Sequence, residues 1–252
     1  MSVEEFFPPH LPEFTLRLFR TPVRRFESVN IGLANVDEVS TFTTSKRRDE
    51  HLTSRWLLEE SLARMGYDVS SLEVLRTSKR APFLSYLPGV WLNSPLPSIS
   101  LCHSGGFAYV ALCDAGWSVG IDAELAQRGI ASNAFDMMSK GEELRWLHEN
   151  PSKAIHLWTA KEAVQKAMQM GMHLNPRVIQ IPIGISLSEI SIEKSKIQLQ
   201  SWTYLSMQIS LAWKQGSQVP RTPEDDLLDA TRAAMRNGCL LYTSDAADEV
   251  VS

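Results

Sequence analysis

The segment from Ser45 to Gly66 has the three- and four-residue spacing of apolar positions that is typical of a helix with one buried face. Charged residues fall between the apolar ones, and glycine, here Gly66, commonly ends a helix. We therefore predict a helix over this segment. Its apolar positions are Leu52, Trp56, Leu57, Leu62 and Met65.

A β-hairpin is predicted farther along the chain. Residues 99–102 and 107–113 are short apolar segments rich in strand-forming residue types, and Ser104-Gly105-Gly106 between them is typical of a tight turn. Residues 119–123 have the same character, and we expect them to form the following strand.

The second half of the chain repeats the order of helix and then strands. Helices are predicted over residues 140–149 and 154–170, followed by a β-rich stretch from 178 to 213. Thr222 and Pro223 are typical of a helix start, so a last helix is expected to run toward Gly238. Because helices and hairpins are segregated, the pattern indicates an α+β fold.

Charge narrows the range of partners. The chain has 25 Lys and Arg residues and 29 Asp and Glu residues, so its net charge of -4 gives no electrostatic reason to expect nucleic acid or an anionic membrane as a partner. Local pairs such as Arg24-Arg25 and Arg47-Arg48 suit a small polyanion, or else form a solvated face. With three cysteines outside any CxxC pattern and no signal peptide, a cytoplasmic location is expected.

The last residues have an unusual sequence. The run from Cys239 to Asp248 resembles the translation of a transposase-based sequencing-library adapter, although an ordinary polar tail is the alternative. We therefore expect that residues 239–252 are not native and leave them out of the fold prediction.

Two carboxylates are candidates for binding a metal ion. Asp122 and Glu124 alternate along the predicted strand, so their side chains leave the same face. Magnesium prefers oxygen ligands and keeps open positions for substrate phosphate. The alternative is a pair of solvated acids at a strand end.

A second group of candidates lies on the predicted helix 154–170. Trp158, Glu162 and Lys166 are spaced by four residues and so share one helix face, which also fits a core tryptophan beside a surface ion pair. His103 ends a predicted strand before the glycine turn, where exposed backbone amides could hold phosphate oxygens; a structural histidine is the alternative.

Together these motifs resemble the 4'-phosphopantetheinyl transferase superfamily, in its larger surfactin- and enterobactin-type branch. The resemblance is carried by four stretches in order along the chain. They are Arg80-Ala81-Pro82, His103-Ser104, the run VGIDAE over 119–124, and the run WTAKEAVQK over 158–166. The resemblance implies two pseudo-symmetric α+β halves, expected at 1–117 and 118–238, with coenzyme A in the cleft between them.

The resemblance also implies a reaction and roles for individual residues. A phosphopantetheine arm would pass from coenzyme A to a serine of an apo acyl or peptidyl carrier protein, with release of 3',5'-ADP, in a monomeric enzyme. Asp122, Glu124 and Glu162 would bind Mg²⁺. Glu162, or a water that it holds, would accept the serine proton, and Lys166 would neutralise phosphate charge. The residues implied to contact coenzyme A are Arg55, Arg80, His103 and Lys161, with Arg47 and Arg48 as further candidates.

Some positions differ from the common family pattern. Cys102 stands where many members have serine, and the alignment leaves open whether Lys79 or Arg80 contacts the 3'-phosphate of coenzyme A. The carrier protein is expected to dock beside Arg128 on an apolar patch, unless the patch residues face the core. These patch residues are Phe135, Met137 and Met138.

Two other functions would use the same residues. One is a paralogue that binds coenzyme A or a carrier protein without turnover. The other is a magnesium-dependent pyrophosphohydrolase, which would not need the helix of Trp158 or a docking patch. The presence of all three acids and of Lys166 favours the transferase.

Overall fold

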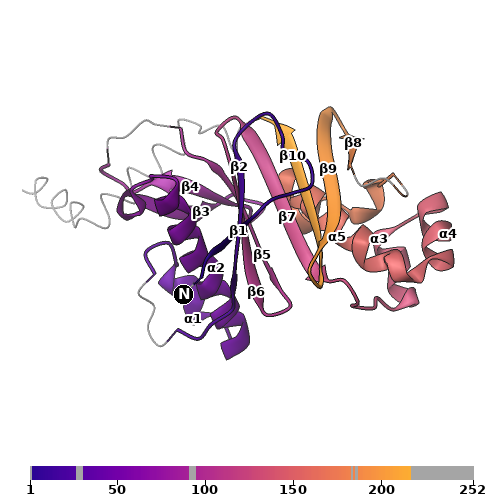
Figure 1. Cartoon of the computed structure of the whole chain (residues 1–252), viewed down its shortest axis with the longest axis horizontal. Coiled ribbons are helices and arrows are strands. Elements are labelled where there is room, and N and C mark those ends of the chain that lie inside the picture. Colours follow the sequence, from indigo (N-terminus) through magenta and orange to yellow (C-terminus); the bar gives the residue numbers. More distant parts are fainter. Residues whose placement is uncertain (1, 27–30, 91–94, 183, 185–186, 217–252) are drawn as a thin grey trace, which may run out of the picture.

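The computed structural model describes residues 2–26, 31–90, 95–182, 184 and 187–216. Its strands fall into two antiparallel four-stranded sheets and one two-stranded ribbon (Figure 1). The first sheet has the order β1 (Glu4–Phe6), β2 (Leu16–Pro22), β6 (Phe107–Cys113), β5 (Ser98–Ser104). The second has the order β7 (Trp117–Leu125), β10 (Met207–Gln215), β9 (Ser195–Tyr204), β8 (Leu187–Ile192). The ribbon pairs β3 (Leu72–Arg76) with β4 (Pro82–Tyr86).

Helices cover the outer faces of the two sheets. Helix α2 (Ser45–Arg64) packs on the first sheet and α5 (Ala154–Ala167) packs on the second, at opposite sides of the molecule (Figure 1). The shorter helices are α1 (Val36–Ser40), α3 (Phe135–Met138) and α4 (Gly141–Glu149). Helices and antiparallel sheets form separate layers, which agrees with the α+β prediction.

The sheets share a central hydrophobic core. Alternate residues of β7 and β10, such as Ile121 and Ile209, face this core, and Leu18 of β2 and Tyr109 of β6 meet them there. The other face of β7 therefore carries Gly120, Asp122 and Glu124 toward α5. This alternation fixes which side of the second sheet can hold a site.

Strands β5 and β7 lie side by side but are not paired by a backbone ladder. Instead, small polar side chains at alternate positions of β5 reach β7. Ser98 donates to the Trp117 carbonyl at 2.5 Å, and Ser100 accepts from the Ile121 amide at 3.0 Å. This side-chain seam joins the two sheets where β5 and β7 meet.

The sequence located most elements correctly. The helix 45–66 and the hairpin of β5 and β6 are confirmed, and the turn is made by Gly105 and Gly106 with φ of 59° and 79°. The strands of the first four-stranded sheet all come before residue 117, and those of the second begin at residue 117. The pseudo-symmetry of the two predicted halves stays a prediction. The expected helix after Thr222 and the tail 239–252 lie outside the described residues. No helix in the described ranges combines the length and hydropathy that crossing a membrane would require.

Candidate active site

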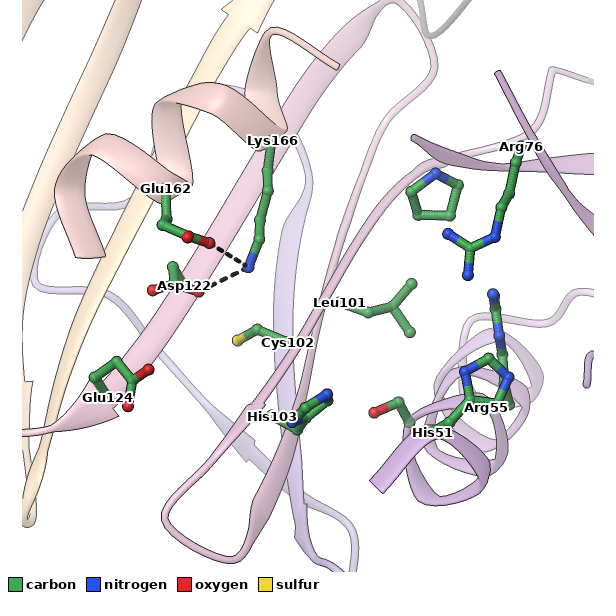
Figure 2. Close-up of a pocket in the computed structure, with 12 residues that line it drawn as sticks. His51, Arg55, Arg76, Leu101, Cys102, His103, Asp122, Glu124, Glu162 and Lys166 are labelled. Atoms are coloured by element: carbon green, nitrogen blue, oxygen red, sulfur yellow. Dashed lines mark hydrogen bonds and ion pairs between the residues drawn. The ribbon is translucent and has the colours of Figure 1, made fainter. Parts of the chain in front are cut away.

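A pocket of about 380 Å³ opens where β5, β7, α2 and α5 approach one another. Acidic side chains lie on the wall formed by β7 and α5, and basic side chains lie on the wall formed by α2 and the end of β3 (Figure 2). The charged residues and histidines that line it are His51, Arg55, Arg76, His103, Asp122, Glu124, Glu162 and Lys166. The pocket therefore presents opposite charges on facing walls.

The acidic wall centres on the Lys166 ammonium group. Lys166 Nζ donates to Asp122 Oδ1 at 2.7 Å and to the Ile121 carbonyl at 3.1 Å, and it lies 3.9 Å from Glu162 Oε2. Glu162 and Lys166 are one helical turn apart on α5, and Asp122 faces them from β7. The structure thus brings together Asp122, Glu162 and Lys166, to each of which the resemblance assigns a role in the reaction.

Burial changes the pKa values of the ionisable groups in this acidic wall. Burial raises the pKa of Asp122 to about 6, an effect that Lys166 opposes and that Glu162 reinforces. Burial alone would lower the pKa of Lys166, but the negative charges around it, chiefly Asp122, outweigh burial and raise that pKa. Cys102 lies beside them, and burial raises the pKa of its thiol, which disfavours the thiolate form.

Glu124 lines the same pocket but has different partners. Its Oε2 accepts a hydrogen bond from Ser104 at 2.6 Å, and its Oε1 accepts one from Arg128 at 2.7 Å. Ser104 is the last residue of β5, so this contact continues the seam between β5 and β7. The seam therefore helps to place Glu124 at the pocket.

The acids match the ligand preference of magnesium in type but are not gathered around one point. Asp122, Glu124 and Glu162 offer only carboxylate oxygens, the ligands that Mg²⁺ prefers. Among the described residues, however, no group of three or more His, Cys, Asp or Glu side chains is close enough to hold a metal ion as it stands. Lys166 lies between Asp122 and Glu162 instead. Magnesium binding thus stays a prediction.

The basic wall contains a buried arginine. Arg55 is only 5% exposed, and its Nη1 has no hydrogen-bond partner among the described residues. Burial, together with the nearby Arg76, lowers the pKa of Arg55 to about 10. Burial and the charge of Arg55 likewise lower the pKa of His51 to about 4. An anion in this pocket would supply the missing partner.

A second pocket, of about 560 Å³, adjoins the first and shares with it His51, Arg76 and His103. Arg47 and Arg80 line this second pocket and not the first. Arg80 has φ of 67° at the tight turn between β3 and β4, a conformation that is strained for a residue with a Cβ atom. The basic wall of the first pocket thus continues into the second pocket.

Two predicted phosphate contacts are not placed at the pockets. Lys161 is fully buried on the opposite side of α5, where Nζ donates to Glu143 Oε2 at 2.6 Å and to two backbone carbonyls. The prediction that Lys161 supports the phosphate site is therefore wrong, because adjacent helix residues point in different directions. Arg48 lines neither pocket and donates to the Phe26 carbonyl at 3.2 Å.

The predicted docking patch also needs correction. Phe135 and Met138 are each 1% exposed and belong to the core beneath α5, so they cannot meet a partner. Met137 alone of the three is exposed. Trp158 packs against the same core, which agrees with the alternative of a core tryptophan on this helix. A short helix buries two of these three neighbours because it turns about 100° per residue.

Sequence reasoning missed His51 and Arg76. A signal for His51 existed, since Arg47, His51 and Arg55 are spaced by four residues and share one face of α2. Arg76 carried no such signal. It reaches the site because β3 ends beside α1 and α2, which only the tertiary fold decides.

One known protein family matches part of the chain. Residues 118–222 match the family model of the 4'-phosphopantetheinyl transferase superfamily, and this range contains the whole acidic wall. No curated protein sequence matches the chain. Over residues 118–222 the chain is thus similar to the 4'-phosphopantetheinyl transferase superfamily.

Proposed function

We propose that the protein transfers the 4'-phosphopantetheine group of coenzyme A to a serine hydroxyl of an apo carrier protein and releases 3',5'-ADP. The observation that supports this most directly is the division of one pocket into an acidic wall with Lys166 and a basic wall with Arg55 (Figure 2). Such a pocket suits a ligand whose diphosphate is held near a cation and whose remaining phosphate meets arginines.

Each charged residue of the acidic wall has a part in this proposal. Asp122, Glu124 and Glu162 would hold Mg²⁺, which when bound supplies positive charge to the diphosphate oxygens. Glu162 accepts the proton of the attacking serine hydroxyl. The serine oxygen forms a bond to the phosphorus next to the pantetheine, and the bond from that phosphorus to the 3',5'-ADP oxygen breaks. Lys166 neutralises the negative charge that develops on the departing oxygen.

Incubation with coenzyme A, Mg²⁺ and an apo carrier protein, followed by mass spectrometry, tests the proposal. We expect the carrier to gain the mass of the phosphopantetheine group. Cleavage of coenzyme A without modification of any carrier in a broad panel would instead identify a pyrophosphohydrolase. Binding of coenzyme A without either product would identify a non-catalytic binding protein.

Replacing an acid of the pocket provides a sharper test. We expect Asp122→Asn and Glu162→Gln each to reduce the transfer rate roughly 100-fold or more, because the first removes a proposed Mg²⁺ ligand and the second also removes the proposed proton acceptor. Glu142→Gln is the matched control, since the side chain of Glu142 is 92% exposed on α4. Near-normal turnover by either pocket variant, with the circular dichroism spectrum unchanged, would contradict the assignment.

A further inference from the structure

The carboxylate of Glu38 lies among the basic side chains of the second pocket. Glu38 belongs to the short helix α1, and its Oε1 accepts a hydrogen bond from Arg76 Nη2. The two side chains are 22% and 34% exposed, so the pair is only partly open to solvent. Arg76 is also one of the arginines that face the first pocket (Figure 2). An acidic group thus occupies a place in a surface otherwise suited to anions.

Electrostatics support an ionised Glu38. Burial would raise the pKa of its carboxyl group, but the charge and hydrogen bond of Arg76 outweigh burial, and Arg55 adds to the effect, so the pKa is lowered. Glu38 in turn moderates the repulsion between Arg55 and Arg76. The carboxylate therefore acts as a counter-ion for the basic wall.

The basic wall is nevertheless incompletely satisfied. Arg55 is only 5% exposed, yet its Nη1 has no hydrogen-bond partner among the described residues. The same is true of Nε2 of His51. Leaving buried polar groups of this kind unpaired is costly. Glu38 therefore pairs with Arg76, while Arg55 Nη1 and His51 Nε2 have no hydrogen-bond partner among the described residues.

We propose that Glu38 is an internal substitute for a ligand phosphate at Arg76, and that it must give way when that phosphate binds. Glu38 would thereby set the affinity for the phosphate that lies away from the acidic wall. The identification of the ligand as the 3'-phosphonucleotide part of coenzyme A rests on the proposed function. The exchange of one anion for another at Arg76 rests on the contacts of Glu38.

The surroundings of Glu38 permit such an exchange. Helix α1 has five residues, of which Val39 is buried whereas Val36 is 62% exposed, so this helix is held to the core at few points. Arg76 has a second contact besides Glu38, because its Nη1 donates to the Arg80 carbonyl at 3.1 Å. A ligand phosphate would thus find a fixed guanidinium and a displaceable carboxylate.

Isothermal titration calorimetry with 3',5'-ADP and 5'-AMP, in EDTA and without a carrier, measures this competition directly. We expect Glu38→Gln to bind 3',5'-ADP roughly three- to thirtyfold more tightly than the unchanged protein. The reason is that a neutral side chain at position 38 no longer competes with the ligand phosphate for Arg76, so a larger fraction of the protein is ready to bind. The gain should be smaller for 5'-AMP, which lacks the second phosphate. Glu5→Gln is the matched control, since Glu5 forms a comparable ion pair with Arg17 away from both pockets.

Arg76→Gln completes the test. This variant should bind 3',5'-ADP more weakly, and adding Glu38→Gln to it should produce no gain, because the two substitutions act on one contact. Unchanged or weaker binding by Glu38→Gln, in a variant that unfolds at the normal temperature, would overturn the proposal. So would an equal gain from Glu5→Gln. A tighter complex without any transfer to carriers would instead preserve the role of Glu38 and reject the proposed reaction.

Discussion

Lys161 shows how neighbouring residues of one motif can serve different purposes. It follows Ala160 and precedes Glu162, yet it points into the core, where it pairs with Glu143. The exposed fractions of the two side chains are 0% and 3%, so neither charge reaches water. Such a pair is costly to break because the remaining charge would be buried alone.

We expect Lys161→Met to lower the free energy of unfolding by roughly 3–5 kcal/mol, as measured by urea denaturation. Replacing Glu143 with Leu in the same protein should recover part of the loss, because no unpaired charge then remains. Binding of 3',5'-ADP to the folded variant should not change. A loss of affinity with normal stability would show that Lys161 contacts the ligand after all.

Arg80 differs from its neighbour Lys79 in position. Both line an apolar pocket beside β5, but only Arg80 also lines the second basic pocket. We expect Arg80→Ala to weaken binding of coenzyme A more than binding of dephospho-coenzyme A, which lacks the 3'-phosphate, by roughly tenfold. Lys79→Ala should affect both ligands equally. Equal losses for both ligands in Arg80→Ala, measured by calorimetry, would refute the role of Arg80.

At the scale of elements, the acidic wall depends on how closely α5 approaches β7. Gly120 permits this approach, because a Cβ atom there would lie 2.0 Å from the Ala163 carbonyl oxygen and 2.4 Å from the Ala167 amide nitrogen. The contact includes the helical turn that carries Lys166, whose Cβ atom would lie 2.9 Å from the added Cβ atom, and Gly120 is two strand positions from Asp122. A glycine outside the binding residues therefore helps to set their separation.

We expect Gly120→Ala to lower the free energy of unfolding by about 3 kcal/mol or more, because the clash involves backbone atoms and α5 would have to move. Urea denaturation measures this, and transfer activity should fall with it. Gly129→Ala is the control, since a Cβ atom at Gly129 would meet nothing within 4 Å. Normal stability of Gly120→Ala would mean that α5 is not held as closely as the structure indicates.

At the scale of the whole molecule, the N-terminal strand connects the first sheet to β9. Glu4 accepts hydrogen bonds from Tyr204 at 2.6 Å and from Arg20 at 2.7 Å, and the Arg20 guanidinium lies over the Tyr204 ring. Nearby, Gln200 exchanges two hydrogen bonds with the backbone of His10. These contacts add to the core that the two sheets share, and so hold together the walls of the pocket.

This connection should depend on pH. The hydrogen bond from Tyr204, followed by that from Arg20, lowers the pKa of Glu4 below its ordinary value of 4.5. A lowered pKa means that ionised Glu4 stabilises the fold above pH 4.5 and that this contribution is lost as the pH falls through the lowered pKa. We expect Glu4→Gln to reduce the melting temperature at pH 7 and to approach the unchanged protein in acid, whereas Glu13→Gln should match it throughout. A difference that stays constant with pH would contradict this origin.

Local patterns determined much of this protein. The period of apolar residues is a property of the sequence itself, which is why helix α2, the hairpin of β5 and β6 and the strand of Asp122 could be located from it. The four-residue spacing likewise placed Glu162 and Lys166 on one face. Spacing could not show that Lys161 is buried, because that depends on what packs against the other face of α5.

Tertiary structure decided which distant residues meet. Arg76 and Glu38 lie 38 positions apart and pair only because β3 ends beside α1. Asp122 and Lys166 meet because Gly120 admits α5, and the basic wall faces them because small polar residues of β5 bind β7. Contacts of this kind arise from packing between elements, whose relative placement no local period encodes.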